Sequence, residues 1–299
     1  MTIFDDYFIS TDQLEKQLKE NSLRIVDATV LYDPSKDESD PEYLASGKPG
    51  YLEHHIPGAT FADLFDLNEP EADVPFTFSN PQLFAEKIQE LGIGSADTTT
   101  VIYDRGSIVG VDLPAYFWAT RLAWQLQIVG VSNVKILDGG FQKWLKEERP
   151  LASGSESYPA SEFEVKYNEM LAADDKDLQT AIKDDQTLII DCLSPQQYAG
   201  EDQPYGEDKA GHIPSSQNVF FAAPGDFKSG ALLDQESIKK QFEKVGALDS
   251  DKEIITYCGF GIAATWIRYL LQALGQEQVR VYDGSLNDWH DKNLPVEKL

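Results

Sequence analysis

One cysteine of this chain stands in a setting that suits a nucleophile. Cys258 follows the strand-like run Glu253 to Tyr257 and precedes the small residues Gly259 to Ala264, after which a helical pattern continues to Leu274. This order predicts a thiol at the carboxyl end of a strand, facing the amino end of a helix. Glycines there let successive N–H groups point at the sulfur, and the helix dipole adds roughly half a positive charge.

Such surroundings stabilise a thiolate or its anionic adduct, so Cys258 is a candidate reactive group. The competing interpretation is an ordinary cysteine that is buried as a small apolar residue. The segment alone leaves both interpretations open.

The composition limits the classes of protein. With 299 residues and a 41% apolar share, the chain is long enough for two domains. Its 25 basic and 51 acidic residues give a net charge of −26, which disfavours binding to nucleic acid or to an anionic membrane. Surface acids in this number also keep a protein soluble.

Two cysteines and four histidines do not provide a disulfide framework, and their spacing is not that of a zinc site. The amino terminus is acidic where a signal peptide is basic, and no apolar run reaches membrane-spanning length. We therefore expect a cytoplasmic protein without a metal site.

Five sequence blocks occur twice in the same order. In the first half they are Leu23–Ala28, His55–Ala59, Leu91–Ile93, Thr100–Asp104, and Ile136–Phe141 with Trp144. In the second half they are Leu188–Cys192, His212–Ser216, Val245–Leu248, Ile254–Cys258, and Val281–Leu286 with Trp289. This repetition predicts two copies of one domain.

Within each copy, short β-branched strands alternate with helical stretches, which predicts an α/β fold with a mostly parallel sheet and helices on both faces. Ligands of such sheets bind outside the carboxyl ends of the strands, where Cys258 falls. Asp104 matches Cys258 in the repeat, so only one copy carries the thiol. We expect a first domain over residues 1–150 without the thiol, a polar linker over 151–165, and a catalytic domain over 166–299.

The ordered set of motifs resembles the two-domain rhodanese sulfurtransferases, a family that includes thiosulfate and 3-mercaptopyruvate sulfurtransferases. The shared features are His-Ile-Pro in each copy, an Asp-Gly turn followed by a tryptophan, Asp104 in one copy and the cysteine loop in the other. The similarity extends from about Phe8 to Pro295. It implies two tandem rhodanese-like domains.

The resemblance also implies a persulfide mechanism. The Cys258 thiolate takes the sulfane sulfur of a small donor, such as thiosulfate, 3-mercaptopyruvate or a persulfide, and passes it to cyanide, a thiol or a dithiol protein. The backbone of the loop would hold the persulfide, with the binding residues Gly259, Phe260, Gly261, Ile262, Ala263 and Ala264. Such an exchange gives ping-pong kinetics and needs neither a metal nor an organic cofactor.

Side chains that would bind the donor depart from the family pattern. The loop after Cys258 has no basic residue, and no arginine follows Asp191. Accessory candidates are His55, Arg105 and Asp283, although a structural turn explains His55 and a helix cap explains Asp283 more simply. Lys209 and Arg268 are further cations, of which Arg268 fits a packing role.

Two other classes share parts of the pattern. A sulfur-carrier or binding protein on the same fold would keep the thiol but show little turnover. A cysteine phosphatase or arsenate reductase would have an arginine at the end of its loop to hold the dianion, and here that place has Ala264 and Thr265.

Cys192 is expected to be buried, and its pairing with Cys258 as a resolving thiol is not predicted, because sequence cannot place the two sulfurs.

Overall fold

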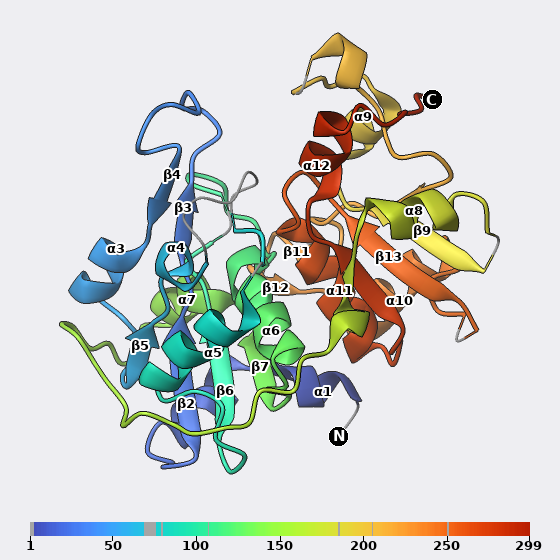
Figure 1. Cartoon of the computed structure of the whole chain (residues 1–299). Coiled ribbons are helices and arrows are strands. Elements are labelled where there is room, and N and C mark those ends of the chain that lie inside the picture. Colours follow the sequence, from blue (N-terminus) through green and yellow to red (C-terminus); the bar gives the residue numbers. More distant parts are fainter. Residues whose placement is uncertain are drawn as a thin grey trace. The chain divides into compact units, whose positions relative to one another are not determined.

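The computed structural model describes residues 3–68, 76–78, 80–106, 108–184, 186–204, 206–249 and 251–299, and its chain forms two compact units (Figure 1). The first unit contains the described residues up to 68, Phe78–Asn168 and the later segment Gly225–Leu233. The second contains Phe76 and Thr77, Glu169–Pro224 and Asp234–Leu299.

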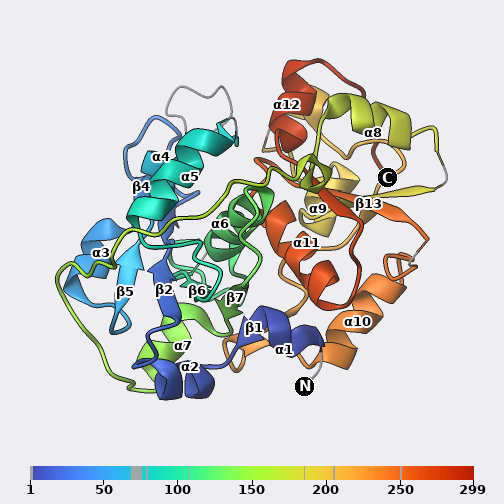
Figure 2. The same cartoon turned by 60° about the horizontal axis from the view of Figure 1, so that its bottom comes forward.

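The first unit is built on a sheet of five strands. Its elements are α1 (Ile3–Tyr7), β1 (Phe8–Ile9), α2 (Thr11–Gln17), β2 (Leu23–Asp27), β3 (Val30–Tyr32), β4 (Leu44–Ser46), α3 (Lys48–Glu53), β5 (Ala59–Phe61), α4 (Leu64–Leu67), α5 (Pro81–Glu90), β6 (Thr99–Tyr103), α6 (Phe117–Ile128), β7 (Val134–Leu137), α7 (Gly140–Lys146), β11 (Gly225–Asp226) and β12 (Ala231–Leu232). The sheet has the order β1-β7-β6-β2-β5, and every pairing in it is parallel. Helix α6 packs on β6 and β7 (Figure 2).

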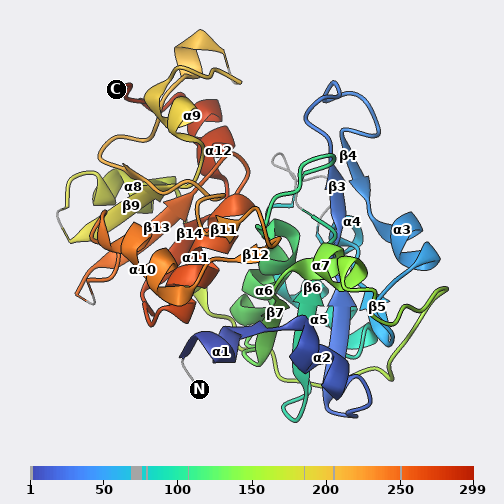
Figure 3. The same cartoon turned by 180° about the vertical axis from the view of Figure 1, so that it is seen from behind.

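The second unit repeats this arrangement. Its elements are η1 (Glu169–Leu171), β8 (Ala172–Ala173), α8 (Asp175–Ala181), β9 (Thr187–Asp191), α9 (Pro195–Ala199), η2 (Glu207–Lys209), β10 (Gln217–Asn218), α10 (Gln235–Glu243), β13 (Glu253–Tyr257), α11 (Ala263–Ala273), β14 (Val279–Tyr282) and α12 (Ser285–Asp291). The sheet order is β8-β14-β13-β9-β10, again with parallel pairings (Figure 3). Helix α11 packs on β13 and β14.

The two sheets therefore have matching strand orders, with β6 and β13 at the centre of each. The predicted α/β fold with two copies of one mostly parallel sheet is confirmed. Central strands of such sheets are buried on both faces, and β6 and β13 show this, because their last four residues are buried in each unit.

The predicted repeat extends to side-chain contacts. Trp144 donates its indole N–H to Pro150 O at 2.8 Å, and Trp289 donates to Pro295 O at 2.9 Å. The hydroxyl of Tyr103 accepts the Ile56 N–H, as that of Tyr257 accepts the Ile213 N–H. The tyrosine bonds tie each His-Ile-Pro turn to the central strand of its sheet, and the tryptophan bonds tie α7 and α12 to the segments that follow them.

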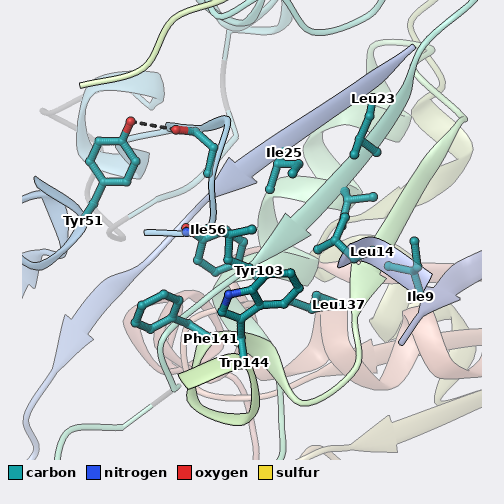
Figure 4. Close-up of a cluster of buried hydrophobic side chains, with 12 residues drawn as sticks. Ile9, Leu14, Leu23, Ile25, Tyr51, Ile56, Tyr103, Leu137, Phe141 and Trp144 are labelled. Atoms are coloured by element: carbon teal, nitrogen blue, oxygen red, sulfur yellow. Dashed lines mark hydrogen bonds between the residues drawn. The ribbon is translucent and has the colours of Figure 1, made fainter. Parts of the chain in front are cut away.

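A cluster of buried side chains forms the core of the first unit beside β2 and β6 (Figure 4). Trp144 and Tyr103 are fully buried in it, and the rings of Tyr103 and Phe141 stack at 5.9 Å. The Tyr51 hydroxyl donates to Ala59 O at 2.7 Å, the bond drawn in Figure 4. Burial of this apolar area stabilises the sheet of the first unit.

The polar segment after Pro150 packs along the first unit. The Tyr158 hydroxyl donates to Gly58 O at 2.6 Å, and the Gln89 side chain donates to Phe163 O at 3.1 Å.

No described helix is long and apolar enough to cross a membrane.

Candidate active site

Cys258 lies directly after β13, at the carboxyl edge of the second sheet, and residues 259–262 connect it to α11. The residue is 3% exposed, and Gly259, Gly261, Ile262, Ala263 and Ala264 are buried as well. Phe260 is the loop residue that is partly exposed. The structure therefore brings the predicted loop together around one buried thiol.

Gly261 is required by the path of this loop. Its φ is +74°, in the left-handed region, and a Cβ on it would lie 2.3 Å from the carbonyl oxygen of Asp283. Any side chain would push the loop away from that carbonyl. Asp283 thus contacts the loop through its main chain. The cap position of α12 is Gly284, the residue after Asp283.

Ser285 holds the main chain of Cys258, a role that the sequence analysis missed. Its hydroxyl accepts the Cys258 N–H at 3.1 Å and donates to Tyr282 O at 2.8 Å. Leu286 N–H also donates to Cys258 O at 3.1 Å. The signal was present in the repeat, because Ser285 replaces Gly140, the second glycine of the first Asp-Gly-Gly turn.

The residue at the cap position of α11 supplies no side-chain cap. Ile262 occupies its cap position without such a bond, whereas Asp234 caps α10 by accepting the Ser237 N–H. The first amides of a helix need an acceptor, and its dipole favours an anion there. An anionic sulfur on Cys258 would meet this requirement.

The first unit shows how an anion is held at the matching position. Asp104 directly follows β6, is 1% exposed, and accepts the N–H groups of Gly106 at 3.0 Å and Ala119 at 3.2 Å. Ala119 is the third residue of α6, so the Asp104 carboxylate caps that helix. Burial nevertheless raises the pKa of Asp104 to about 6.

The Arg105 side chain makes structural contacts within the first unit. Its Nε lies 3.0 Å from Asp27 Oδ2, another N–H group donates to His54 O, and its guanidinium stacks 3.9 Å from the Phe141 ring centre. Asp104 and Arg105 do line a cavity of about 660 Å³ in this unit, together with Lys143. The cavity has acidic and basic groups but no thiol.

The remaining candidates are also placed. His55 is fully buried, with Nδ1 2.8 Å from Tyr51 O and its ring stacked on Tyr51, which favours the structural interpretation. Arg268 is buried in α11 and donates to Val279 O at 3.1 Å, so it packs as expected. Lys209 is exposed in η2.

Cys192 is fully buried directly after β9, the neighbour of β13. Burial raises the pKa of its thiol well above the ordinary value, and the nearby charges of Cys258 and Asp191 act in the same direction. Burial likewise raises the pKa of Asp191 to about 6. Among the described residues, no three His, Cys, Asp or Glu side chains are grouped so as to hold a metal ion.

Comparison with known proteins agrees with this arrangement. The rhodanese-like domain model matches residues 10–147 and 174–292. A 3-mercaptopyruvate sulfurtransferase of Escherichia coli is 29% identical over 295 residues, covering 98% of both chains. The sulfur carrier protein TtuD of Thermus thermophilus is 31% identical over 314 residues, covering 98% of this chain and 97% of the relative.

A solved structure shows the same similarity. SseA from Escherichia coli, described as having the rhodanese fold of 3-mercaptopyruvate sulfotransferases, superimposes with a TM-score of 0.77 at 28% identity, covering 93% of this chain and 98% of that one. The resemblance inferred from the motifs is confirmed, and the chain belongs to the rhodanese-like domain family, of which it carries two copies.

Proposed function

We propose that this protein is a sulfurtransferase that carries a sulfane sulfur on Cys258. The observation that supports this most is the buried thiol at the carboxyl edge of the sheet, in front of α11, whose cap residue Ile262 supplies no side-chain acceptor. The Cys258 thiolate attacks the sulfane sulfur of a donor, and the rest of the donor leaves with the electron pair of the bond that breaks. The resulting persulfide anion lies before the amino end of α11. Preorganised N–H donors stabilise such charge without reorganising during the reaction.

The anion site in this proposal is made of main chain. Gly261 permits the turn that closes the loop, and Ser285 fixes the Cys258 N–H so that the residue keeps its orientation. An acceptor thiol then attacks the outer sulfur and regenerates the Cys258 thiolate. Each half of the exchange leaves the enzyme in a stable form, so ping-pong kinetics follow.

The preferred donor in this proposal is a persulfide. A dianion such as thiosulfate calls for paired cationic side chains, but Arg105 is bonded to Asp27 and Arg268 is buried against Val279 O. The net charge of −26 also slows the approach of anions. We expect the highest kcat/KM with a low-molecular-weight persulfide, then 3-mercaptopyruvate, then thiosulfate.

The test is a steady-state assay of the three donors, each with cyanide and with a dithiol as acceptor. Parallel double-reciprocal lines, and loss of all transfer in Cys258→Ser with an unchanged circular dichroism spectrum, support the proposal. Transfer that survives in the folded Cys258→Ser protein contradicts it. A higher kcat/KM for thiosulfate than for the persulfide contradicts the donor order alone.

A sulfur carrier with little turnover is the second candidate, and the relative named sulfur carrier protein TtuD favours it. The two functions differ in the number of cycles. A carrier accepts one sulfur per chain and then stops with small acceptors, whereas a sulfurtransferase gives many equivalents of product per chain.

A further inference from the structure

The strand register places the two cysteines of the chain side by side. In the pairing of β13 with β9, Tyr257 lies opposite Asp191. The next residue of each strand is therefore Cys258 and Cys192. The Cys192 N–H donates to Tyr257 O at 2.9 Å, which continues the parallel ladder past the strand ends.

Neighbouring strands of a sheet run about 4.8 Å apart. Disulfide-bonded cysteines have Cα atoms about 4.4 to 6.8 Å apart, so adjacent positions in register fall in this range. Side chains in register on parallel strands also leave the sheet on the same face.

The position of Cys192 is fixed on both sides. Its N–H is bonded to β13, and its carbonyl accepts the Phe221 N–H at 3.0 Å. The thiol is fully buried and lies within electrostatic range of Cys258, since the charge of a Cys258 thiolate acts on it. Both cysteines are free thiols in this structure.

We propose that Cys192 is an internal resolving thiol, which discharges the Cys258 persulfide when no external acceptor arrives. This inference rests on the proposed function, because the persulfide supplies the sulfur that leaves. It adds a second product, hydrogen sulfide, and a resting form with a Cys192–Cys258 disulfide. An external reductant, such as a dithiol, returns that form to two thiols.

The step is a thiol–disulfide exchange. The Cys192 sulfur attacks Cys258 Sγ, and a new S–S bond forms between the two cysteines as the bond to the outer sulfur breaks. The electron pair of the broken bond leaves with the outer sulfur, which takes the Cys192 proton and departs as hydrosulfide; protonation in water then gives hydrogen sulfide. No other oxidant is consumed.

Attack at Sγ, rather than at the outer sulfur, follows from placement. Cys192 is in register with Cys258, and in this proposal the outer sulfur extends toward the amino end of α11. The buried Cys192 thiol stays protonated in the resting protein, which slows the exchange. Fixed proximity offsets this, because effective molarities of well-placed intramolecular groups reach about 10⁵ M or more.

The first unit supplies the matched control residue. The counterpart of Cys192 is Ala28, whose N–H donates to Tyr103 O at 2.9 Å in the same ladder position. Alanine is thus compatible with this backbone, and Cys192→Ala is the natural variant to test. Cys192→Ser serves as a second variant that fills nearly the same volume.

The experiment loads the full-length protein with inorganic polysulfide without oxygen, removes the excess by gel filtration, and adds no acceptor. Intact mass spectrometry first reports whether Cys258 carries an extra sulfur. Sulfide release and non-reducing peptide mapping then follow the discharge over minutes to hours. Circular dichroism confirms that both variants are folded.

We expect the wild type to release one sulfide per loaded chain and to yield a peptide in which Cys192 and Cys258 are linked. The loaded Cys192→Ala and Cys192→Ser proteins should lose their sulfur at least about tenfold more slowly. Equal rates of loss in all three proteins, or sulfur loss without the linked peptide, overturns the inference while leaving the proposed function intact. Failure of Cys258 to load in all three overturns both.

Discussion

The two units place different groups at the same point of the same sheet. After β6 the first unit has Asp104, whose carboxylate accepts amide N–H groups and caps α6. After β13 the second unit has the thiol of Cys258, in front of α11. One copy holds a carboxylate at this position, and in our proposal the other holds a sulfur that changes its charge and bonding during the reaction.

The surroundings of the two positions differ in a consistent way. Residues 105–116 separate Asp104 from α6, whereas residues 259–262 separate Cys258 from α11. Ala28 and Gly140 in the first unit are replaced by Cys192 and Ser285 in the second. The comparison teaches that a thiol alone does not define the site, because its neighbours have changed with it.

The largest effect on sulfur transfer is expected from replacing the Cys258 thiol. Cys258→Ser should reduce sulfur transfer to the uncatalysed background, and adding Asp104→Cys should not restore it. Position 104 lies near the Asp27 carboxylate, whose negative charge opposes a second anion, and it lacks the turn made by Gly261. Transfer assays and peptide mapping of the folded double variant provide the measurement, and donor sulfur recovered on position 104 would show that the units are chemically equivalent.

The next largest effect is expected from replacing a glycine in the turn after Cys258, compared with a glycine in the turn after Asp104. Gly261 and Gly106 both have positive φ, but a Cβ on Gly106 would meet no atom of the described residues within 4 Å, whereas one on Gly261 would meet the Asp283 carbonyl. Both alanine variants pay about 1 kcal/mol for the backbone conformation. We expect Gly261→Ala also to lower kcat/KM by roughly 10- to 100-fold through displacement of the loop.

Gly106→Ala is the control for this comparison, with transfer expected near the wild-type rate. Kinetics and denaturant unfolding of the two variants measure the difference. Equal kcat/KM values would mean that the loop tolerates a shift and that its geometry does not determine the rate.

Two buried acids give each unit its own pH dependence. The folded-state pKa of both Asp104 and Asp191 is raised to about 6 by burial. Between about pH 4 and 6 the unfolded chain therefore loses protons that the folded chain keeps, so stability falls as pH rises through this window, by roughly 3 kcal/mol for each group. The loss is complete above the folded pKa.

Asp104→Asn and Asp191→Asn should each remove one of these contributions and flatten the dependence of unfolding free energy on pH. Denaturant titrations at a series of pH values from about 4 to 8 test this, with the wild type as reference. An unchanged slope in a variant would show that the carboxyl it lacks ionises alike in the folded and unfolded chain.

The smallest effect concerns the residue that holds the Cys258 main chain. Ser285 has φ +50°, and its counterpart Gly140 has φ +55°, so Ser285→Gly removes a hydroxyl while easing the backbone. We expect stability to change by no more than about 1 kcal/mol and kcat/KM to fall by roughly 3- to 10-fold. The reverse change, Gly140→Ser, would place a Cβ 2.9 Å from Asp104 O and should lower stability without affecting transfer. An unaltered kcat/KM in Ser285→Gly would remove Ser285 from the site.

Much of the fold was predictable because short stretches of sequence indicate it. Apolar strands such as those ending at Asp27 and Asp191, helices between them, and the repetition of these blocks all leave patterns in the sequence. The loop from Gly259 to Ala264 was equally visible, since small residues after a strand predict a turn with free amides.

Other features depend on contacts that no local pattern encodes. The register that puts Cys192 beside Cys258 depends on how two strands pair. The sequence of either strand alone does not predict which residues will be opposite each other. The ion pair of Arg105 with Asp27 likewise joins residues far apart in the sequence. The segment Gly225–Leu233 belongs to the first unit although it lies within the second half of the chain, where the Leu232 N–H donates to Asp138 at 3.0 Å.

The most direct test of the central claim is to follow one sulfur atom on the intact protein. The wild type receives a pulse of a persulfide donor, is mapped by mass spectrometry, and is mapped again after a dithiol is added. The account predicts one extra sulfur on the peptide that contains Cys258, its loss to the dithiol, and its return with a second pulse. Sulfur on any other residue, or rapid transfer while Cys258 remains unmodified, would contradict it.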